Sequence, residues 1–371
     1  MLRAGLVGAT GIVGQQFVLA LQEHPWFELS QLAASERSAG KSYRQALTEP
    51  GSGAFRWYCP EAPGERVLDM EVRTVDGLDL GQLDVVFTAI ESDEARQLEP
   101  WLADRVPVIS TAAAFRMEPD VPLFVSTINA GHAKLIDRQR QVRGWKGFIA
   151  PQPNCTTIGL ATTLKPVYDR WGLNLVLMTS MQAISGAGRA GGVLGLDILD
   201  NVVPYIPKEE EKVQQETQKV LGVLADGEAA DGESSVDGQF IRPAEFPVSC
   251  TCTRVNVIDG HTEAVFVSTR EKASVEEVKA AFREYRSGLE ELGLPSAPCQ
   301  LIAVSEDPFR PQPRLDRDVS GGMTTSVGRV REDHALPNGL KWVLVSHNTK
   351  MGAAKGAVLI AELLAKKGYI G

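Results

Sequence analysis

The first third of the chain alternates short apolar runs with segments whose apolar positions repeat at helical spacing. Its start predicts a buried strand over 2–7, a glycine-rich turn with the sequence GATGIVG, and a helix over 13–21. Further elements are predicted as strands over 29–34, 85–90 and 106–111 and as a helix over 91–104. Strands that alternate with helices in this way predict a parallel, doubly wound sheet.

The pattern changes near residue 150. The stretch PQPNCTT carries two prolines, places Asn154 at the position of a helix N-cap, and continues with helical periodicity from Cys155. Beyond it, the predicted elements are strands over 173–184, 248–258 and 262–269 and helices over 209–224 and 275–292. This mixture predicts an α+β domain on a mostly antiparallel sheet. The acidic, Gly/Ser-rich segment 225–239 is interpreted as a surface excursion of that domain.

The C-terminal end combines a strand pattern, WVLVSHNTK, with a helix pattern, MGAAKGAVLIAELLAKKG. Small residues such as Gly352 permit close approach to a ligand or to another backbone. We expect this helix to pack back on the first domain. The predicted division is therefore one unit made of 1–150 and 348–371, and a second unit made of 151–347.

Length and composition narrow the class of protein. At 371 residues the chain exceeds the size at which one hydrophobic core usually stops growing, so two domains are expected. Its 43% hydrophobic content is that of a globular protein, and its net charge of −9 argues against a broad surface for nucleic acid or anionic membranes. No apolar run is long enough to span a bilayer and no signal-like leader is present, so a cytoplasmic protein is expected.

The five cysteines form an odd and scattered set, which suits reduced thiols better than a disulfide framework. Cys250 and Cys252 are close enough in sequence to suggest a metal site, but no histidine cluster accompanies them. We therefore interpret both as residues of a buried strand and predict no metal.

The turn GATGIVG lies directly after the first strand and opens the first helix, which is the context that a pyrophosphate site requires. Glycines permit the tight turn, and the helix N-terminus offers unpaired N–H groups and a positive dipole to phosphates. The spacing is GxxGxxG rather than the commoner GxGxxG, and a purely structural turn is the alternative. The predicted cofactor contacts are Gly8, Thr10, Gly11, Ile12, Val13 and Gly14.

The end of the second predicted strand bears on which dinucleotide is bound. NAD enzymes usually place an acidic residue there, whereas this chain reads ASERSAGK over 34–41. Ser35, Arg37 and Ser38 can donate hydrogen bonds to a ribose 2′-phosphate, which favours NADP. Glu36 leaves NAD open, and a solvated loop is the alternative for the whole segment.

Cys155 follows Asn154 at the start of a predicted helix. The N–H groups and dipole at a helix N-terminus stabilise a thiolate and lower the pKa of a cysteine there. We therefore expect a nucleophilic thiolate at neutral pH, although a cysteine at a helix start is more often structural.

Several separated motifs carry a family resemblance. PQPNCTT, MQAISGAGRAGG at 181–192 and CTRVNVIDGHTE at 252–263 resemble aspartate-β-semialdehyde dehydrogenase, and the likeness runs from GATGIVGQ to MGAAKGAVLIAELL. ASERSAGK and NVVPYIPKEEEKVQQET are similar to the branch common in archaea and fungi. The resemblance implies a glyceraldehyde-3-phosphate dehydrogenase-like fold, in which the first unit is a Rossmann-type NADP-binding domain and the second a catalytic and dimerisation domain.

The resemblance also implies an activity. It implies NADP-dependent reduction of β-aspartyl phosphate to aspartate β-semialdehyde, in the biosynthesis of lysine, threonine and methionine. In this chemistry the Cys155 thiolate displaces phosphate to form a thioester, whose carbonyl then accepts a hydride. The implied partners are therefore a small-molecule substrate, phosphate, and further copies of the chain in a homodimer or homotetramer.

Three residues match the family's machinery around the nucleophile. His261, in DGHTE, matches the catalytic acid/base, Gln182 the residue that orients the acyl intermediate, and Arg254 the arginine that holds the substrate α-carboxylate. Without the resemblance, each has an ordinary structural interpretation, as a turn histidine, polar filling of a strand, and a surface arginine. The other histidines in polar loop contexts are expected at the surface: His24, His132 and His334.

The resemblance assigns the substrate phosphate to Arg116 and Lys212, and the substrate amino group to Glu209. A solvated acidic face is an equal alternative for Glu209, and Glu210 is a second candidate for the amino group, because both belong to one acidic run. Asn154, beside the nucleophile, is placed among the substrate contacts.

Asn348 and Gly352 resemble the nicotinamide-side contacts of the family, although SHNTKMGAA lacks an arginine that some relatives carry. Two other functions stay open at this point. A related thioester reductase, such as malonyl-CoA reductase, would share Cys155 and His261 without needing the phosphate pair or Glu209. A non-catalytic NADP-binding regulator would carry Cys155 as a structural residue.

Overall fold

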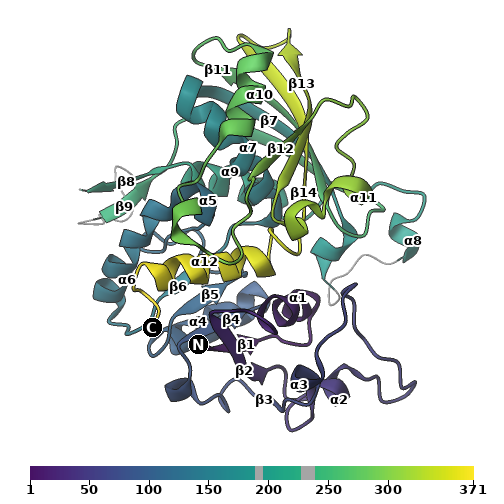
Figure 1. The fold of residues 1–371 in the computed structure, drawn as a ribbon, viewed down its shortest axis with the longest axis vertical. Helices are drawn as coiled ribbons and strands as arrows, with labels where there is room; N and C mark the ends of the chain where they lie inside the picture. The colour runs from purple at the N-terminus through teal and green to yellow at the C-terminus, as the bar shows by residue number, and fades with distance from the viewer. Residues whose placement is uncertain (189–194, 227–238) are drawn as a thin grey trace.

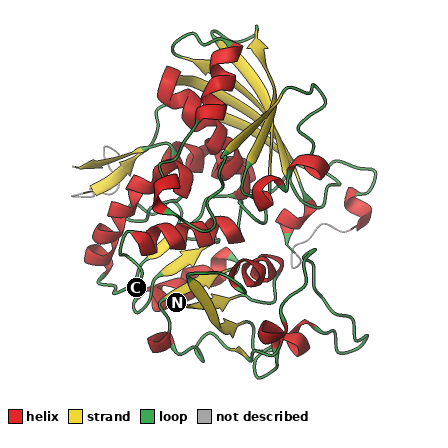
Figure 2. Cartoon of the chain, in the orientation of Figure 1, coloured by secondary structure: helices red, strands yellow, loops and turns green. Residues whose placement is uncertain are grey.

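The computed structural model describes residues 1–188, 195–226 and 239–371, which form two sheets with helices between and around them (Figures 1 and 2). The first sheet contains, in spatial order, β3 (Val72–Arg73), β2 (Phe27–Ala33), β1 (Leu2–Val7), β4 (Val85–Thr88), β5 (Val108–Ser110) and β6 (Ile149–Pro151). All its neighbouring pairs are parallel. The predicted doubly wound sheet is therefore confirmed, and its strand order reverses beside β1, where such folds bind ligands.

Helices cover both faces of this sheet. They are α1 (Ile12–Leu21), α2 (Tyr43–Leu47), α3 (Glu65–Leu68), α4 (Ser92–Ala103), α5 (Ser126–Asn129), α6 (Leu135–Arg143) and α12 (Ala354–Lys366). Phe17 of α1 and Val358 of α12 share one apolar core with Phe87 of β4, whereas Leu102 of α4 packs in a second core. The C-terminal helix thus packs against α1 as expected, and in Figure 1 it crosses between the two sheets.

The second sheet is mixed. Its strands, in spatial order, are β10 (Val248–Arg254), β7 (Leu173–Gln182), β11 (His261–Thr269), β14 (Gly339–Ser346), β13 (Thr325–Asp333) and β12 (Ile302–Ser305). The three central pairs are antiparallel, but β10 joins β7 and β12 joins β13 in parallel. The expectation of a mostly antiparallel sheet describes its centre only, because long crossovers return the chain to both edges in the parallel direction.

The remaining elements surround this sheet. They are α7 (Cys155–Trp171), α8 (Gly195–Ile198), α9 (Glu209–Val220), α10 (Val275–Glu284), α11 (Pro313–Asp316) and the hairpin of β8 (Val223–Asp226) with β9 (Gln239–Arg242). Two predicted helices end early: α9 gives way to β8, and α10 stops before an extended residue, Tyr285. Most of the acidic segment 225–239 lies outside the described residues.

Helices α7 and α12 meet between the two sheets, where Ile158 and Leu359 belong to one apolar cluster. This contact fixes the start of α7 near the carboxyl ends of the parallel strands. Within the ranges that the structure describes, no helix is long and apolar enough to cross a membrane.

Two of the three histidines expected at the surface are buried. His24 contacts Glu362 of α12, with 2.9 Å between Nε2 and Oε1. The two ring nitrogens of His132 contact the Asn129 amide and the Gly222 carbonyl. Only His334 is exposed. The polar sequence around His24 and His132 misled the prediction, because side chains distant in sequence supply their hydrogen-bond partners.

Candidate active site

The N-terminus of α7 places Cys155 at the first helical position. The side chain of Asn154 caps the helix by accepting a hydrogen bond of 2.8 Å from the Thr156 amide, so the predicted N-cap is present. The carboxylate of Glu216 on α9 accepts a hydrogen bond of 2.6 Å from the backbone N–H of Asn154. The start of α7 is thus held by its own cap and by a second helix.

The strand register of the mixed sheet gathers polar side chains from four strands. Arg254 lies opposite Gln182, and His261 lies opposite Ser346. The β7–β11 register continues this row by placing His261 beside Gln182. Residues opposite each other point to the same sheet face. Four residues therefore form one row across the sheet, which we call the polar row: Arg254, Gln182, His261 and Ser346. Residues far apart in sequence become neighbours there.

His261 contacts the nucleophile directly. Its Nε2 lies 3.1 Å from Sγ of Cys155, and its Nδ1 accepts a hydrogen bond of 3.0 Å from the backbone N–H of Ala183. Because Nδ1 acts as the acceptor, the proton of the neutral ring lies on Nε2, directed at the sulfur. Burial, followed by the charge of Arg254, lowers the pKa of His261 to about 3. The ring is therefore neutral and orients its proton toward the reaction centre.

The Cys155 thiol differs from its prediction. Its enclosed position and the nearby Glu209 raise its pKa, outweighing the lowering effects of Arg254, Arg116 and the Thr156 amide. The expectation of a stabilised thiolate from the helix start alone is therefore wrong for the unliganded site. The residue as a whole keeps partial exposure.

Glu209 and Glu210 turn to different places. Glu209 is buried and its Oε1 accepts hydrogen bonds from Nδ2 of Asn154 at 2.9 Å and Nε2 of Gln182 at 3.0 Å. Glu210 instead accepts a hydrogen bond of 3.0 Å from the backbone N–H of Cys252, which belongs to the edge strand β10. The structure therefore brings Glu209, and not Glu210, to the polar row.

Arg254 is buried and has one modest contact. Its Nη1 donates to the Ala183 carbonyl at 2.8 Å. The turn 184–187 covers Arg254 and His261, and a Cβ at Gly186 would lie 3.1 Å from Nη1 of Arg254. The other guanidinium nitrogens have no hydrogen bond or ion pair among the described residues, so they can bind a carboxylate in a bidentate manner.

Arg116 and Lys212 are both connected to the start of α7 through helix α9. Arg116 is buried and pairs with Glu216 at 3.0 Å, while its Nε has no partner. Lys212 lies on α9 three residues after Glu209 and four before Glu216, both of which face the α7 start. The side-chain ammonium group of Lys212 has no hydrogen bond or ion pair in the described part of the chain. Two cationic groups are thus available for an anion.

The glycine-rich turn shows which glycines the protein itself requires. Gly8 has a φ of +83°, and a Cβ on Gly14 would lie 2.2 Å from the Gly8 carbonyl oxygen. A Cβ on Gly11 would meet only that oxygen, at an ordinary 3.5 Å. No contact within the described chain therefore requires Gly11 to be glycine, as expected where a ligand approaches the backbone.

The other predicted cofactor contacts of the turn and the second strand lie at the carboxyl end of the parallel sheet. Thr10, Ile12 and Val13 are only partly buried, and α1 has no side-chain cap. After β2, Ser35 and Arg37 are exposed and Ser38 is buried. An exposed guanidinium beside the start of α1 is suited to a phosphate group.

Asn348 and Gly352 hold the other side of the site. The Asn348 amide donates to Ser185 Oγ at 2.8 Å and accepts the Gly260 N–H at 2.8 Å, which ties the 184–187 turn to the residue before His261. A Cβ on Gly352 would lie 2.8 Å from Cβ of Cys155. Gly352 is therefore required by the close packing against the nucleophile, whatever else it contacts.

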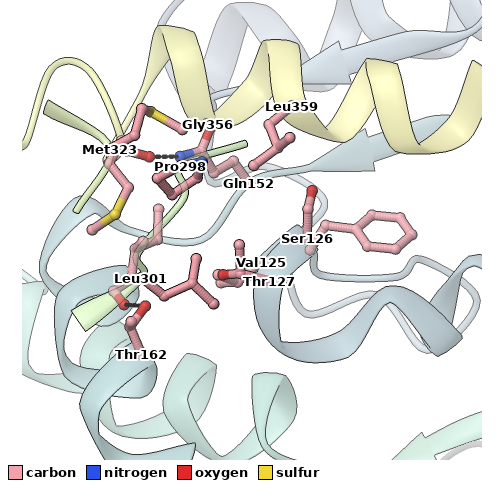
Figure 3. A pocket seen from close by; sticks show the side chains of 13 residues that line it. Val125, Ser126, Thr127, Gln152, Thr162, Pro298, Leu301, Met323, Gly356 and Leu359 are labelled. Carbon is pink, nitrogen blue, oxygen red and sulfur yellow. Dashed lines mark hydrogen bonds between the residues drawn. The ribbon is translucent and has the colours of Figure 1, made fainter. Parts of the chain in front are cut away.

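A small cavity of about 30 Å³ lies between α5, α7 and α12, lined by apolar side chains such as Leu301 and Met323 (Figure 3). Gln152 donates to the Met351 carbonyl beside it at 2.7 Å, and the Oε1 of Gln152 is buried without a partner. The cavity has room for about one water molecule. Because none of the residues of the polar row lines it, it is not the substrate site.

Sequence reasoning missed Glu216 and Ser346. Glu216 lies seven residues after Glu209, so two turns of helical spacing place both on one face of α9. Helical periodicity alone was therefore a usable signal for Glu216. Ser346 gives no such signal, since only strand pairing places it opposite His261. Among the described residues, no group of three or more His, Cys, Asp or Glu side chains is arranged to hold a metal.

Comparisons with known proteins agree with this architecture. Residues 3–136 match the family model "Semialdehyde dehydrogenase, NAD binding domain", and 164–351 match "Semialdehyde dehydrogenase, dimerisation domain". Aspartate-semialdehyde dehydrogenase of Methanothermobacter thermautotrophicus is 46% identical over 364 residues, 98% of this chain and 99% of that protein. The Candida albicans enzyme is 44% identical over 379 residues, covering 99% of both chains.

Two solved structures extend the comparison. A Candida albicans aspartate semialdehyde dehydrogenase with NADP has a TM-score of 0.85 and 40% identity, covering all of both chains. Aspartate semialdehyde dehydrogenase II of Vibrio cholerae, complexed with ASA, has a TM-score of 0.74 and 28% identity, covering 99% of this chain and 98% of that one.

Proposed function

This chain belongs to the aspartate-semialdehyde dehydrogenase family, and from that premise we propose how its own residues carry out the reaction. The enzyme is a phosphorylating aldehyde oxidoreductase of the aspartate pathway. We infer that it reduces β-aspartyl phosphate to aspartate β-semialdehyde through a thioester on Cys155. The observation that carries the proposal is the 3.1 Å contact between Cys155 and His261 at the start of α7.

Substrate binding prepares the nucleophile. The α-carboxylate is held by the free nitrogens of Arg254, the amino group by Glu209, and the phosphate by Arg116 and Lys212. A substrate ammonium group beside Glu209 offsets the negative charge that raises the pKa of the Cys155 thiol. The part of the rise that Glu209 causes is therefore smaller when the substrate is in place, and the thiolate forms more easily.

Acyl transfer and reduction then use the polar row. As the Cys155 sulfur attacks the acyl carbon, the thiol proton passes to the leaving phosphate, the bond from that carbon to the phosphate oxygen breaks, and hydrogen phosphate leaves. Gln182 and Asn154, which share Glu209 as acceptor, orient the acyl group. When bound, the reduced nicotinamide cofactor supplies a hydride to the thioester carbonyl. His261 donates a hydrogen bond from Nε2 to the carbonyl oxygen of the thioester, which becomes negative when the hydride adds. Cleavage of the C–S bond then releases the aldehyde and returns the Cys155 sulfur as a thiolate.

We propose NADP as the cofactor of the NAD(P)-binding domain. Gly11 leaves room for a pyrophosphate. Ser35 and Arg37, which are exposed, and the buried Ser38 would bind the ribose 2′-phosphate. The solved Candida albicans relative contains NADP. Asn348 and Gly352 adjoin Cys155 from the C-terminal segment and would hold the nicotinamide side.

We also propose the division into 1–150 with 348–371, and 151–347. It is supported by the core that α12 shares with α1, and by the separate apolar core of the mixed sheet. The family model over 164–351 is named a dimerisation domain, so we propose a homodimer formed through the second unit, with a homotetramer as the larger alternative.

The proposal is tested by replacing the nucleophile. Cys155→Ala should lower phosphate-dependent reduction of NADP with aspartate semialdehyde by several orders of magnitude, with NADP affinity unchanged. Cys299→Ala is the matched control, since Cys299 is exposed and makes no hydrogen bond with the site residues among those described. Full turnover by Cys155→Ala would overturn the role of the thiol. Turnover of malonate semialdehyde in preference to aspartate semialdehyde would overturn the substrate.

A further inference from the structure

Glu263 is a buried carboxyl group that the proposed chemistry does not use. It lies on β11 two residues after His261, on the same sheet face, and it is fully buried. Among the described residues, neither carboxyl oxygen has a hydrogen-bond partner. Buried polar groups without partners are rare, and one beside a reaction centre requires an explanation.

A glycine of helix α7 lies against the Glu263 side chain. Gly159 lies one turn after Cys155 in α7, and a Cβ there would lie 3.1 Å from Oε1 of Glu263 and 2.5 Å from Oγ of Ser346. Glycine in a helix interior costs about 1 kcal/mol relative to alanine. Three unfavourable features, a helical glycine, an unpartnered carboxyl and an unpartnered serine hydroxyl, thus coincide beneath the Cys155–His261 pair.

The surroundings of Glu263 hold it neutral. Cys252 on β10 is the titratable group that acts on Glu263, and His261 lies two residues before it on β11. The strands β7 and β14 place Ser180 and Leu344 opposite it. None of these is a cation. Burial, with Cys252 adding to it, raises the pKa of Glu263 well above its usual value.

We propose that Glu263 is a positioning residue for the reaction: as a neutral acid packed with Ser346 against Gly159, it forms the uncharged floor of the Cys155–His261 pair. Ionisation of this floor would place a negative charge behind the nucleophile. That charge would oppose formation of the thiolate and of the negative oxygen of the hemithioacetal. The inference rests on the proposed roles of Cys155 and His261.

The test compares pH profiles. Turnover of the intact enzyme should fall at alkaline pH as Glu263 ionises, and Glu263→Gln, which cannot ionise, should move that limb upward by at least one pH unit. Glu263→Ala should lower kcat at least tenfold more than Glu263→Gln, with KM little changed. Glu99→Gln is the matched control, because Glu99 is also fully buried but lies under the parallel sheet. An unchanged alkaline limb in Glu263→Gln, or an equal shift in Glu99→Gln, would overturn the proposal.

A second pair of variants tests the packing. Gly159→Ala should lower kcat, and adding Ser346→Ala should restore part of it by removing the oxygen that the new methyl group meets. A double variant no more active than Gly159→Ala would contradict the proposed packing of Ser346 and Glu263 against Gly159. The rate of Cys155 alkylation by iodoacetamide, followed by the mass of its peptide, reports on the thiol without any substrate. Glu263→Gln should raise this rate at alkaline pH, which keeps the test independent of the proposed turnover.

Discussion

The two ligand-binding regions of the molecule are prepared in opposite ways. Around Cys155, several protein groups already hold one another in position: His261 is oriented by Ala183, Glu209 holds Asn154 and Gln182, and Glu216 ties Arg116 to α7. At the glycine-rich turn, α1 begins without a side-chain cap. The catalytic region is thus organised before its ligand arrives, whereas the dinucleotide region keeps backbone donors for its ligand.

This difference reflects what each region must do. Acyl transfer requires donors fixed to within fractions of an ångström, and buried contacts from several elements provide that fixation. Phosphate binding requires free N–H groups and space, which a glycine turn at a helix start provides with few side chains. The catalytic region should therefore be sensitive to polar substitutions, and the dinucleotide turn to added volume.

The largest effect is expected at His261. His261→Asn removes the ring whose Nε2 faces the sulfur, so we expect kcat to fall by roughly 10²–10⁴-fold. NADP affinity, measured by fluorescence titration, should stay at the wild-type value. His334→Asn is the matched control because His334 is exposed. A loss below tenfold would show that the preorganised row is not essential to the chemistry.

The next effect concerns the glycines of the turn. Gly14→Ala places a Cβ 2.2 Å from the Gly8 carbonyl oxygen, so we expect it to lower the free energy of unfolding by about 1–3 kcal/mol. Gly11→Ala meets no such contact and should unfold like the wild type while binding NADP more weakly. Urea unfolding and calorimetric NADP titration separate the two results. Normal NADP binding by Gly11→Ala would indicate that the pyrophosphate lies elsewhere.

A comparable effect concerns pH and Glu99, the buried carboxyl beneath the parallel sheet. Its Oε1 accepts hydrogen bonds from Thr88 at 2.6 Å and Ser110 at 2.5 Å, yet burial raises its pKa from 4.5 to about 7. The folded state therefore binds a proton that the unfolded state releases, and stability declines as pH rises from about 4.5 through about 7.

Glu99→Gln should abolish that decline. Between low pH and pH above 7, the free energy of unfolding of the wild type should fall by about 3 kcal/mol more than that of the variant. The reason is that one pKa unit corresponds to about 1.4 kcal/mol. Unfolding free energies measured at pH 5 and pH 8 test it. Parallel pH profiles for the two proteins would mean that Glu99 stays ionised.

The smallest effect is expected at the end of β2. Arg37→Ala should weaken NADP binding about tenfold and leave NAD binding unchanged, because a charge-assisted hydrogen bond contributes about 1.5–3 kcal/mol. Arg44→Ala is a suitable control, since Arg44 is exposed and pairs with Glu65. Equal losses for both cofactors would remove Arg37 from the 2′-phosphate and return Glu36 to consideration.

Local pattern was sufficient for much of the fold. The buried strand before GATGIVG, the Asn154 cap and the helix that starts at Cys155 all follow from nearest neighbours in sequence. The missed features depend on distant partners. His24 is buried because Glu362 contacts it, and the Cys155 thiol has a raised pKa partly because Glu209 lies close by. Patterns in the neighbouring sequence cannot show that these charged side chains lie close by.

The parallel sheet, the helix starts and, through the motifs, the family can all be predicted from the order of the residues. Periodicity and caps act over a few residues, so they can be recognised without knowledge of the fold. Folding in three dimensions is needed to bring Arg254, Gln182, His261 and Ser346 into one row, to add Glu209 rather than Glu210, and to set Gly159 against Glu263. Strand register sets these neighbours, and a shift by one residue would turn each side chain to the other face.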